Sequence, residues 1–354
     1  MSAGNSDPLT TIAAAPPDFA PEEAQVIVLE QYGLEVQARP LVSERDQNFR
    51  LVDAGGAEFV LKIANSAEDP DVTRFQIEGL MYLHKSIRRL DLDIRAPGII
   101  PTSGGDPYCT LDHAGQRHMA RVVTYLPGVP LSSVPLTPAL CRGLGKTLAS
   151  LAKGLAGFSH VGANQSLLWD MKRALDLRRL LQFFDDPHLR QAVSQCLDDF
   201  GARALPVLDG ARAQVIHNDL HGDNVLVQAY DAEIIAGVID FGDMLYSPLI
   251  IDLGVAAAYL HNDNDPLLFI ESLVAGYDSE TPLLQDELDV LVYLVKARLA
   301  ATIAIHQWRA SARAADDPYR VLSQQSAKDA YAFLQLLNTI PVDDVRARLR
   351  AACA

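Results

Sequence analysis

The sequence is poor in cysteine and aromatic residues, and it has no long uninterrupted apolar run. Its four cysteines are far apart and form no Cys-x-x-Cys pair, so the pattern of a zinc site or a thioredoxin-like redox centre is missing. So few cysteines in 354 residues favour reduced thiols, and we expect a cytoplasmic protein. The most apolar stretch, 291–305, is interrupted by Lys296 and Arg298, so no membrane span is predicted. The first 20 residues have no basic leader or apolar run typical of a signal peptide.

Basic residues are also in the minority. The chain has 45 acidic residues against 30 Lys and Arg, which gives a formal net charge of -15. Such a surface repels the phosphates of nucleic acids and of anionic lipids, so neither nucleic acid nor a membrane is an expected partner. It suits a cationic small substrate, and the sequence indicates no particular protein partner. Hydrophobic residues make up 49% of the chain, which is enough for a large folded core.

The residue patterns divide the chain into a tail and two lobes. We expect a flexible tail over 1–20, an N-lobe over 21–125, a C-lobe over 126–340 and a C-terminal helix or tail over 341–354. The N-lobe pattern is a small sheet with one inserted helix, preceded by a helix that opens at Pro21 and ends near Gly33. Its predicted strands are 36–42, 49–52, 58–63, 108–112 and 118–125, and its inserted helix is 71–89.

The composition changes at the Leu-Pro-Gly-Val-Pro segment 126–130, which we interpret as a linker. Beyond it the pattern is mainly helical, apart from an island at 214–241 where short apolar strands bracket polar residues. Helices are predicted at 138–160, 167–183, 187–205, 249–261, 265–277, 283–310 and 320–338. The sequence therefore predicts an α+β, two-lobed fold with a small sheet lobe and a larger, mainly helical lobe.

The island contains two polar motifs in the order found in protein kinases. The first is H-x-D-L-x-x-x-N, formed by His217, Asp219 and Asn224, and the second is D-F-G, beginning at Asp240. Either motif alone arises by chance, and Asp and Asn between strands are usually turn residues. Both motifs in this order, with apolar strands beside them, indicate phosphoryl transfer.

The chemistry of that reaction explains the residue types. Mg²⁺ prefers oxygen ligands, and Asn224 and Asp240 supply an amide and a carboxylate oxygen. Asp219 is then available to accept a hydrogen bond from the substrate hydroxyl, so its work is mainly orientation with late proton acceptance. His217 is expected to support the loop rather than to titrate in the reaction.

The N-lobe supplies the residues that would contact the nucleotide. Lys62 lies on a predicted strand, and Glu78 on the following helix is its predicted partner, with Glu58 and Glu68 as weaker competitors. The turn that would cover the phosphates, 41–49, contains no glycine, so Ser43 and backbone amides are its candidate phosphate contacts.

These residues resemble the aminoglycoside phosphotransferase and choline kinase-like superfamily, over roughly residues 22–340. Three details look most like hydroxylysine kinase-like, amino-alcohol kinase domains, namely the turn 43–49, the stretch 121–128 and the Asp-Phe-Gly-Asp-Met segment 240–244. The resemblance implies a two-lobed protein kinase-like fold that binds Mg²⁺ with ATP or GTP as phosphate donor. It also implies that the nucleotide base forms hydrogen bonds with the connecting segment around Val123, Thr124 and Tyr125. Many relatives have glycine where this chain has Asn218, and little effect is expected from that difference.

The resemblance also implies the activity. The favoured function is transfer of the γ-phosphate to a hydroxylysine-like amino alcohol, and the alternative acceptors are homoserine, choline, methylthioribose and an aminoglycoside. A function of another class, a non-catalytic nucleotide-binding regulatory module, is suggested by the glycine-free turn. Candidates for substrate contact are Asp243, Asp252, Tyr259 and Trp308, although Asp252 is equally suited to brace the catalytic loop and Trp308 to lie in the core.

Overall fold

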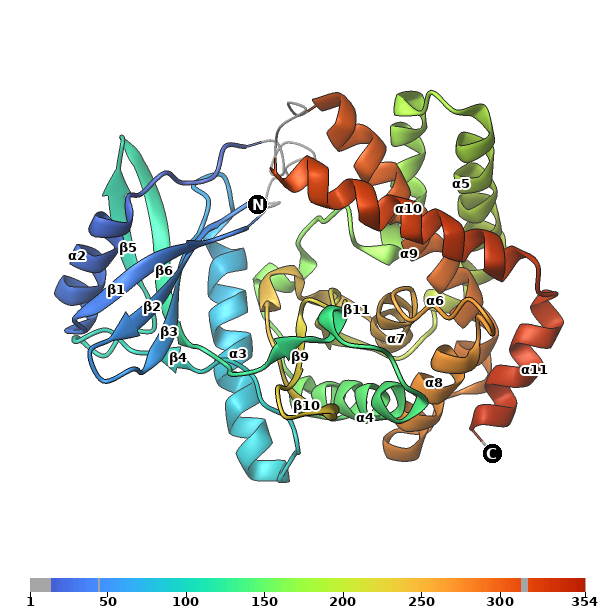
Figure 1. The fold of residues 1–354 in the computed structure, drawn as a ribbon, viewed down its shortest axis with the longest axis horizontal. Helices are drawn as coiled ribbons and strands as arrows, with labels where there is room; N and C mark the ends of the chain where they lie inside the picture. The colour runs from blue at the N-terminus through green and yellow to red at the C-terminus, as the bar shows by residue number, and fades with distance from the viewer. Residues whose placement is uncertain (1–13, 44, 313–317, 354) are drawn as a thin grey trace. The chain divides into compact units, whose positions relative to one another are not determined.

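The computed structural model describes residues 14–43, 45–312 and 318–353. The chain forms two compact units (Figure 1). The first unit contains the described residues up to Asp91, together with Arg95–Pro127 and Phe158–Ser166. The second contains Leu92–Ile94, Gly128–Gly157 and the described residues from Leu167 on. The predicted C-lobe range therefore differs from the second unit, because residues 158–166 pack with the first.

The first unit is built on one antiparallel sheet of six strands. Their order is β1-β2-β3-β6-β4, and β5 pairs with β6. The strands are β1 (Val36–Leu41), β2 (Gln47–Asp53), β3 (Glu58–Ile63), β4 (Ile99–Ile100), β5 (Cys109–His113) and β6 (Gln116–Thr124). This matches the sheet predicted from the sequence, except for β4. Two residues are too short a run to give a strand pattern.

Alternation of side chains along the strands gives this sheet two different faces. On one face, Leu61 and Ile63 are fully buried in a cluster with Val28 of helix α2 (Pro21–Tyr32). On the other, Arg121 of β6 donates from Nη2 to Oε1 of Gln76 on helix α3 (Pro70–Leu90) at 2.6 Å. Lys62 is the register partner of Arg121, so it lies on the α3 face of the sheet.

The tail predicted over 1–20 differs from the structure at its end. Residues 1–13 lie outside the described residues, but Phe19 is 5% exposed and stacks on His113 with ring centroids 4.1 Å apart. The main chain of Phe19 also donates to and accepts from the Gln47 side chain, at 2.8 and 2.9 Å. Phe19 is therefore part of the core of the first unit rather than of a flexible tail.

Residues 158–166 complete the first unit from a later part of the chain. The helix predicted over 138–160 ends at Leu155, because the segment from Phe158 on packs against α3. The ring of Phe158 stacks on Phe75 of α3 with centroids 5.8 Å apart. At Gly162, in the short 3₁₀ helix η2 (Val161–Asn164), a Cβ atom would lie 2.4 Å from the carbonyl oxygen of Asp71. Only glycine allows this approach.

The second unit contains two small sheets from the region predicted as an island of strands. One has the order β10-β9-β7 and the other pairs β11 with β8, all antiparallel. The strands are β7 (Val129–Pro130), β8 (Ala213–Ile216), β9 (Val225–Gln228), β10 (Asp231–Val238) and β11 (Leu245–Pro248). The segment interpreted as a linker, 126–130, thus ends in a strand that pairs with β9.

The rest of the second unit is helical. Its α-helices are α4 (Pro138–Leu155), α5 (Pro187–Asp199), α6 (Leu205–Leu208), α7 (Leu249–Ala257), α8 (Leu268–Glu280), α9 (Gln285–Ala312), α10 (Pro318–Asn338) and α11 (Val342–Ala352). Its 3₁₀ helices are η1 (Leu131–Ser133), η3 (Met171–Phe183) and η5 (Phe241–Asp243), and η4 (Phe200–Ala204) is a π-helix. The segment predicted as helix 167–183 is mostly the 3₁₀ helix η3, and the helix predicted over 187–205 contains the π turn η4 before α6. The helix predicted over 249–261 ends at Ala257.

Helix α9 forms the centre of this unit, between α7 and α10 among others (Figure 1). Every residue from 290 to 305 is buried, including Arg298. A helix that is apolar on all sides lies inside a protein, and a charged residue inside one needs a partner.

Helices α4 and α8 approach each other closely at two glycines. A Cβ atom on Gly145 would lie 2.1 Å from the carbonyl oxygen of Leu273, and one on Gly276 would lie 2.0 Å from that of Arg142. The Gly-Lys-Thr sequence at 145–147 therefore belongs to a helix contact. All four cysteines are free. Among the described residues, no helix is both long and apolar enough to cross a membrane.

Candidate active site

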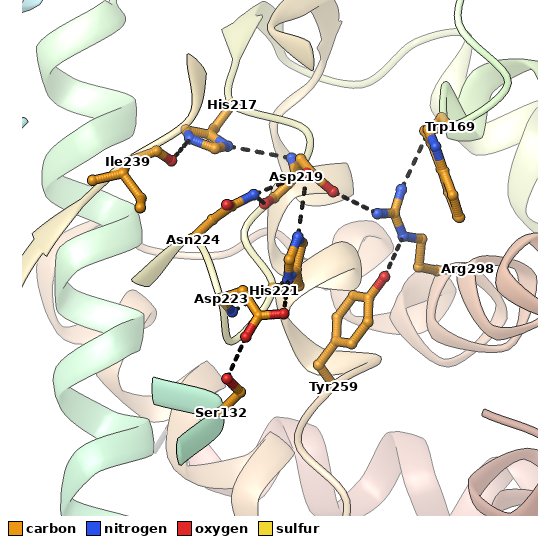
Figure 2. Close-up of polar contacts among 10 residues, drawn as sticks. All are labelled: Ser132, Trp169, His217, Asp219, His221, Asp223, Asn224, Ile239, Tyr259 and Arg298. Carbon is orange, nitrogen blue, oxygen red and sulfur yellow. Dashed lines mark hydrogen bonds and ion pairs between the residues drawn. The ribbon is translucent and has the colours of Figure 1, made fainter. Parts of the chain in front are cut away.

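The two sequence motifs meet at the ends of three strands of the second unit. Residues 217–224 link β8 to β9, and Asp240 follows β10. The β9–β10 pairing continues one step beyond the strands, because Ile239 donates its N–H to the Asn224 carbonyl at 2.9 Å. Asn224 in turn donates from Nδ2 to a carboxylate oxygen of Asp219 at 2.9 Å (Figure 2). The structure thus brings Asp219, Asn224 and Asp240 together.

Two buried groups hold the loop that carries Asp219. Asp252 of α7 accepts the main-chain N–H groups of His217 and Asn218, at 3.0 and 2.6 Å. Burial raises the pKa of Asp252 to about 6, although these two bonds act in the opposite direction. His217 contacts the Ile239 carbonyl through Nε2 at 3.1 Å, and its Nδ1 accepts the N–H of Asp219. Both residues therefore brace the loop, which is the role expected of His217 and one of the two roles considered for Asp252.

The backbone of the loop is left-handed at Asn218, with φ 67°. This conformation favours glycine, and Asn is one of the few other residues that adopt it. The side chain is fully buried, and neither Oδ1 nor Nδ2 has a hydrogen-bond partner among the described residues. Glycine at this position would fit the backbone without this strain.

The carboxylate of Asp219 has donors at both oxygens. Oδ1 accepts from Nη2 of Arg298 at 2.8 Å. Oδ2 accepts from Asn224 and lies 3.4 Å from Nε2 of His221. Burial acts to raise the pKa of Asp219, but His221 and Arg298 outweigh it and hold this pKa below its ordinary value. Asp219 is therefore an anionic hydrogen-bond acceptor in a fixed orientation.

His221 carries the opposite charge beside it. Burial opposes that charge, but the carboxylate of Asp219 raises the pKa of His221 to about 9. On its other side, Nδ1 of His221 lies 3.7 Å from the carboxylate of Asp223, which accepts the Ser132 hydroxyl. Ser132 follows β7 and contacts the loop at Gly222, whose carbonyl accepts its N–H at 3.1 Å. The tip of the loop is therefore fixed to the start of the second unit.

The residues proposed for the metal fit an oxygen-binding cation. Nδ2 of Asn224 is committed to the carbonyl and the carboxylate of Asp219, at 2.8 and 2.9 Å, so Oδ1 is the atom of this amide suited to be an oxygen ligand. Asp240 has a left-handed backbone, with φ 60°, which is common at functional sites. The described residues contain no group of three or more His, Cys, Asp or Glu able to hold a metal. Mg²⁺ in nucleotide sites is usually bound by one or two protein groups, phosphates and water.

The first unit carries Lys62 on β3, on the face of the sheet that α3 covers. The α3 residue that contacts the sheet is Gln76, through Arg121, the register partner of Lys62. Glu78 is two residues on, about 200° around the helix, where it is exposed and lies 3.8 Å from His160. Its pairing with Lys62 stays a prediction. The competitor Glu58 forms an ion pair with Arg50.

The other predicted nucleotide contacts also lie in the first unit. Val123 is 5% exposed, with β3 on one side and β4 on the other. The N–H groups of Thr124 and Tyr125 donate to the carbonyls of Gly98 and Glu58, at 2.9 and 3.2 Å. These two N–H groups are thus not the ones that would bind a nucleotide base. Ser43 is partly buried just after β1, next to Glu44, which lies outside the described residues.

The candidate substrate residues Tyr259, Trp308 and Asp243 differ in burial and in the groups that they contact. The Tyr259 hydroxyl accepts from Nε of Arg298 at 3.3 Å, so it already contacts a cation of the protein. Trp308 is 7% exposed on α9, as expected of a core residue. Asp243 of η5 is partly buried, and its charge acts on Arg298.

Sequence reasoning missed Arg298, Trp169 and His221. The guanidinium of Arg298 lies 4.4 Å from the Trp169 ring centroid, and its side chain is 1% exposed. The signal was present in the sequence, because Arg298 interrupts the most apolar stretch of the chain. Nothing in that pattern specified that its partner lies 79 residues away.

This fold and site define a kinase-like phosphotransferase. The sequence pattern of the phosphotransferase enzyme family matches residues 37–283. The chain belongs to this family, and it is a small-molecule kinase.

Known proteins are similar to this chain over most of its length. The chain is 26% identical to hydroxylysine kinase of Xenopus laevis over 347 residues, which covers 91% of this chain and 90% of the relative. Among solved structures, a microcompartment-associated aminopropanol kinase matches with a TM-score of 0.68 and 20% identity, over 94% of this chain and 98% of that one. An amicoumacin kinase in complex with AMP-PNP and Ca²⁺ matches with a TM-score of 0.67 and 15% identity, over 92% and 95%. These structural matches support the kinase-like fold.

Proposed function

We propose that this protein transfers the γ-phosphate of ATP or GTP to the hydroxyl of a small, cationic amino alcohol similar to hydroxylysine. The observation that carries the proposal is the convergence of Asp219, Asn224 and Asp240 at the ends of β8, β9 and β10. The similarity to hydroxylysine kinase and to an aminopropanol kinase supports the substrate class, since both names denote a hydroxyl compound that carries an amine. The net charge of -15 also favours a cationic substrate.

Each residue has a defined task in this reaction. Mg²⁺, when bound, neutralises charge on the phosphate oxygens. Asn224 would hold it through Oδ1 and Asp240 through its carboxylate. On the nucleotide side, Lys62 would contact the phosphates, with Glu78 as its proposed partner. Ser43, Val123 and Tyr125 are the further proposed nucleotide contacts.

Asp219 accepts a hydrogen bond from the hydroxyl of the substrate and so directs the hydroxyl oxygen at the γ-phosphorus. A bond forms between the hydroxyl oxygen and the phosphorus while the bond from the phosphorus to the bridging β–γ oxygen breaks. The hydroxyl proton then passes to the carboxylate of Asp219. Because the pKa of Asp219 is held low, proton acceptance comes late, and orientation is the larger contribution.

A turnover screen with one isosteric variant tests the proposal. The purified protein is assayed for nucleoside diphosphate release with ATP and with GTP. The acceptors are hydroxylysine, 1-amino-2-propanol, homoserine, choline, methylthioribose and an aminoglycoside. Asp219→Asn should lower kcat by about 10²–10⁴-fold while nucleotide binding remains. The control is Asp231→Asn, an exposed carboxylate at the start of β10 that bonds only the N–H of Glu233 among the contacts described.

The outcomes separate the alternatives. Turnover of another acceptor in preference to hydroxylysine or aminopropanol would replace the proposed substrate. Nucleotide binding without turnover of any acceptor would favour a regulatory module. Undiminished turnover by Asp219→Asn would refute the role of Asp219.

A further inference from the structure

A buried cation on the central helix contacts the proposed catalytic carboxylate. Arg298 comes from the middle of α9, and its side chain is 1% exposed. Its Nη2 donates to Oδ1 of Asp219 at 2.8 Å, its Nε to the Tyr259 hydroxyl at 3.3 Å and its Nη1 to the Trp169 carbonyl at 3.5 Å. The guanidinium also lies over the Trp169 ring, 4.4 Å from its centroid (Figure 2). Each of its three nitrogens therefore has a partner.

Stability alone does not account for this arrangement. Moving an arginine and a carboxylate out of water costs more than an isolated pair usually regains, and well-packed apolar residues commonly serve stability better. The neighbours of Arg298 along α9, Ala297 and Leu299, are such apolar core residues. What the arginine provides, and an apolar side chain would not, is a donor aimed at one oxygen of Asp219.

The orientation of Asp219 depends on both of its oxygens. The terminal torsion of an aspartate is broad, so a carboxylate bonded at one oxygen can still rotate. Asn224 and His221 contact Oδ2, whereas Arg298 is the donor to Oδ1 among the hydrogen bonds described. With Arg298 in place the carboxylate plane is fixed at two points. Each carboxylate oxygen has two lone pairs, so Oδ1 can accept a substrate hydroxyl as well.

Trp169 and Tyr259 fix the arginine in the same way. The Trp169 ring sets the plane of the guanidinium, and its carbonyl and the Tyr259 hydroxyl take the two nitrogens that Asp219 does not use. Lysine at 298 would keep the charge but would present a single flexible ammonium instead of a planar fork.

We propose that Arg298 is a positioning residue for the phosphoryl transfer, which fixes the rotation of the Asp219 carboxylate and is itself oriented by Trp169 and Tyr259. This inference rests on the proposed function, since it concerns the same site. It assigns a role to a helix that lies outside the kinase motifs and outside the segment matched by the family pattern.

The test compares Arg298→Met, Arg298→Lys and Arg298→Ala with wild type. Misplacement of a reacting group costs about 10²-fold, so Arg298→Met should lose that factor in kcat while the KM for nucleotide changes less than about twofold. Arg298→Lys should recover only part of kcat, because it restores the charge without the fork. Methylguanidinium in the buffer should raise the kcat of Arg298→Ala, and methylammonium should raise it less.

Arg348→Met is the matched control. Arg348 binds Asp265 and Glu271 in the same unit, away from the proposed site, at distances of 2.7–2.9 Å for three of its contacts. This variant should lose thermal stability and keep its kcat. If Arg298→Met fails to fold, Tyr259→Phe still tests the proposal, since it removes one partner of the guanidinium. It should lower kcat by about threefold to tenfold in wild type and have little further effect in an Arg298→Lys background.

Crystal structures of wild type and Arg298→Met give a readout that needs no substrate. The carboxylate of Asp219 should be rotated or in two orientations in the variant. An unrotated carboxylate, or a kcat equal to that of wild type, would overturn the inference. A wild type that phosphorylates no acceptor would refute the proposed function, whereas the crystal structures would still decide whether Arg298 fixes Asp219.

Discussion

Replacing Asn218 by glycine should stabilise the protein, although this residue directly precedes Asp219. Its backbone is left-handed, with φ 67°, and its buried amide has no hydrogen-bond partner among the described residues. Glycine removes both features at once. It keeps the main-chain N–H that donates to Asp252 at 2.6 Å, so the loop keeps its brace.

The expected gain follows from four contributions. Relief of the left-handed strain is worth about 1.5 kcal/mol, and the larger backbone entropy of glycine in the unfolded chain costs about 1 kcal/mol. Removing two buried polar atoms that have no partner gains about 2 kcal/mol. The packing lost with the side chain costs about 1 kcal/mol. The net stabilisation of Asn218→Gly is therefore about 1.5 kcal/mol, which corresponds to a rise in Tm of about 2 °C for a chain of 354 residues.

Asn218→Ala is the matched control, because alanine removes the amide but keeps a Cβ atom on the left-handed backbone. Its gain should be smaller than that of glycine, so the expected order of stability is glycine, alanine, wild type. Urea unfolding followed by circular dichroism measures the free energies, and thermal shift measures Tm. An Asn218→Gly variant less stable than wild type would refute the reasoning about both strain and burial.

Two further predictions concern the histidines of the loop and the helix contact at Gly145. Burial lowers the pKa of His217 to about 4, and the carboxylate of Asp219 overcomes burial to raise that of His221 to about 9. NMR spectra of histidine-labelled protein, assigned with His217→Gln and His221→Gln, measure both pKa values. The His217 ring should stay neutral from pH 8 to 5, and the His221 ring should titrate near 9. A midpoint near 6.5 for either ring would contradict this prediction. Neutral His217 contributes about 3 kcal/mol above pH 6.5, which is lost as pH falls towards 4, whereas charged His221 contributes below pH 6.5 and its contribution is lost as pH rises through 9. Gly145→Ala should destabilise the protein by about 2–3 kcal/mol in urea unfolding, because the new Cβ atom would meet the Leu273 carbonyl. The control is Gly143→Ala on the same helix, where the nearest atom to a new Cβ would be 4.0 Å away. This variant should be neutral or slightly stabilising.

The fold was accessible from the sequence wherever a local pattern determines an element. The hairpin of β2 and β3 has alternating strands around Asp53–Gly56, and Gly33 ends α2 with φ 65°. Both were predicted within a residue or two. The 3₁₀ helix η3 was predicted as an α-helix, because apolar spacing near 3.6 residues does not separate the two forms when tertiary packing decides between them.

The site was predictable to the extent that its residues are close in sequence. His217, Asp219, Asn224 and Asp240 are joined by the β9–β10 hairpin, so their convergence follows from local pairing. Arg298 is 79 residues from Asp219, and only the packed helices bring the two together. The pairing of Lys62 with Glu78 stays a prediction, because the rotation of a helix about its axis depends on packing that a single sequence does not specify. On α3, Gln76 bonds Arg121 and Glu78 lies 3.8 Å from His160.

The return of residues 158–166 to the first unit limits how the protein can be divided. A fragment that stops at Pro127 would lack Phe158, whose ring covers Phe75, and would leave that aromatic surface open to water. Expressing the first unit alone therefore calls for a recombinant chain in which a short artificial linker joins Pro127 to Phe158. Exchanging the first unit between relatives would likewise need coordinated junctions after Pro127 and on each side of residues 158–166.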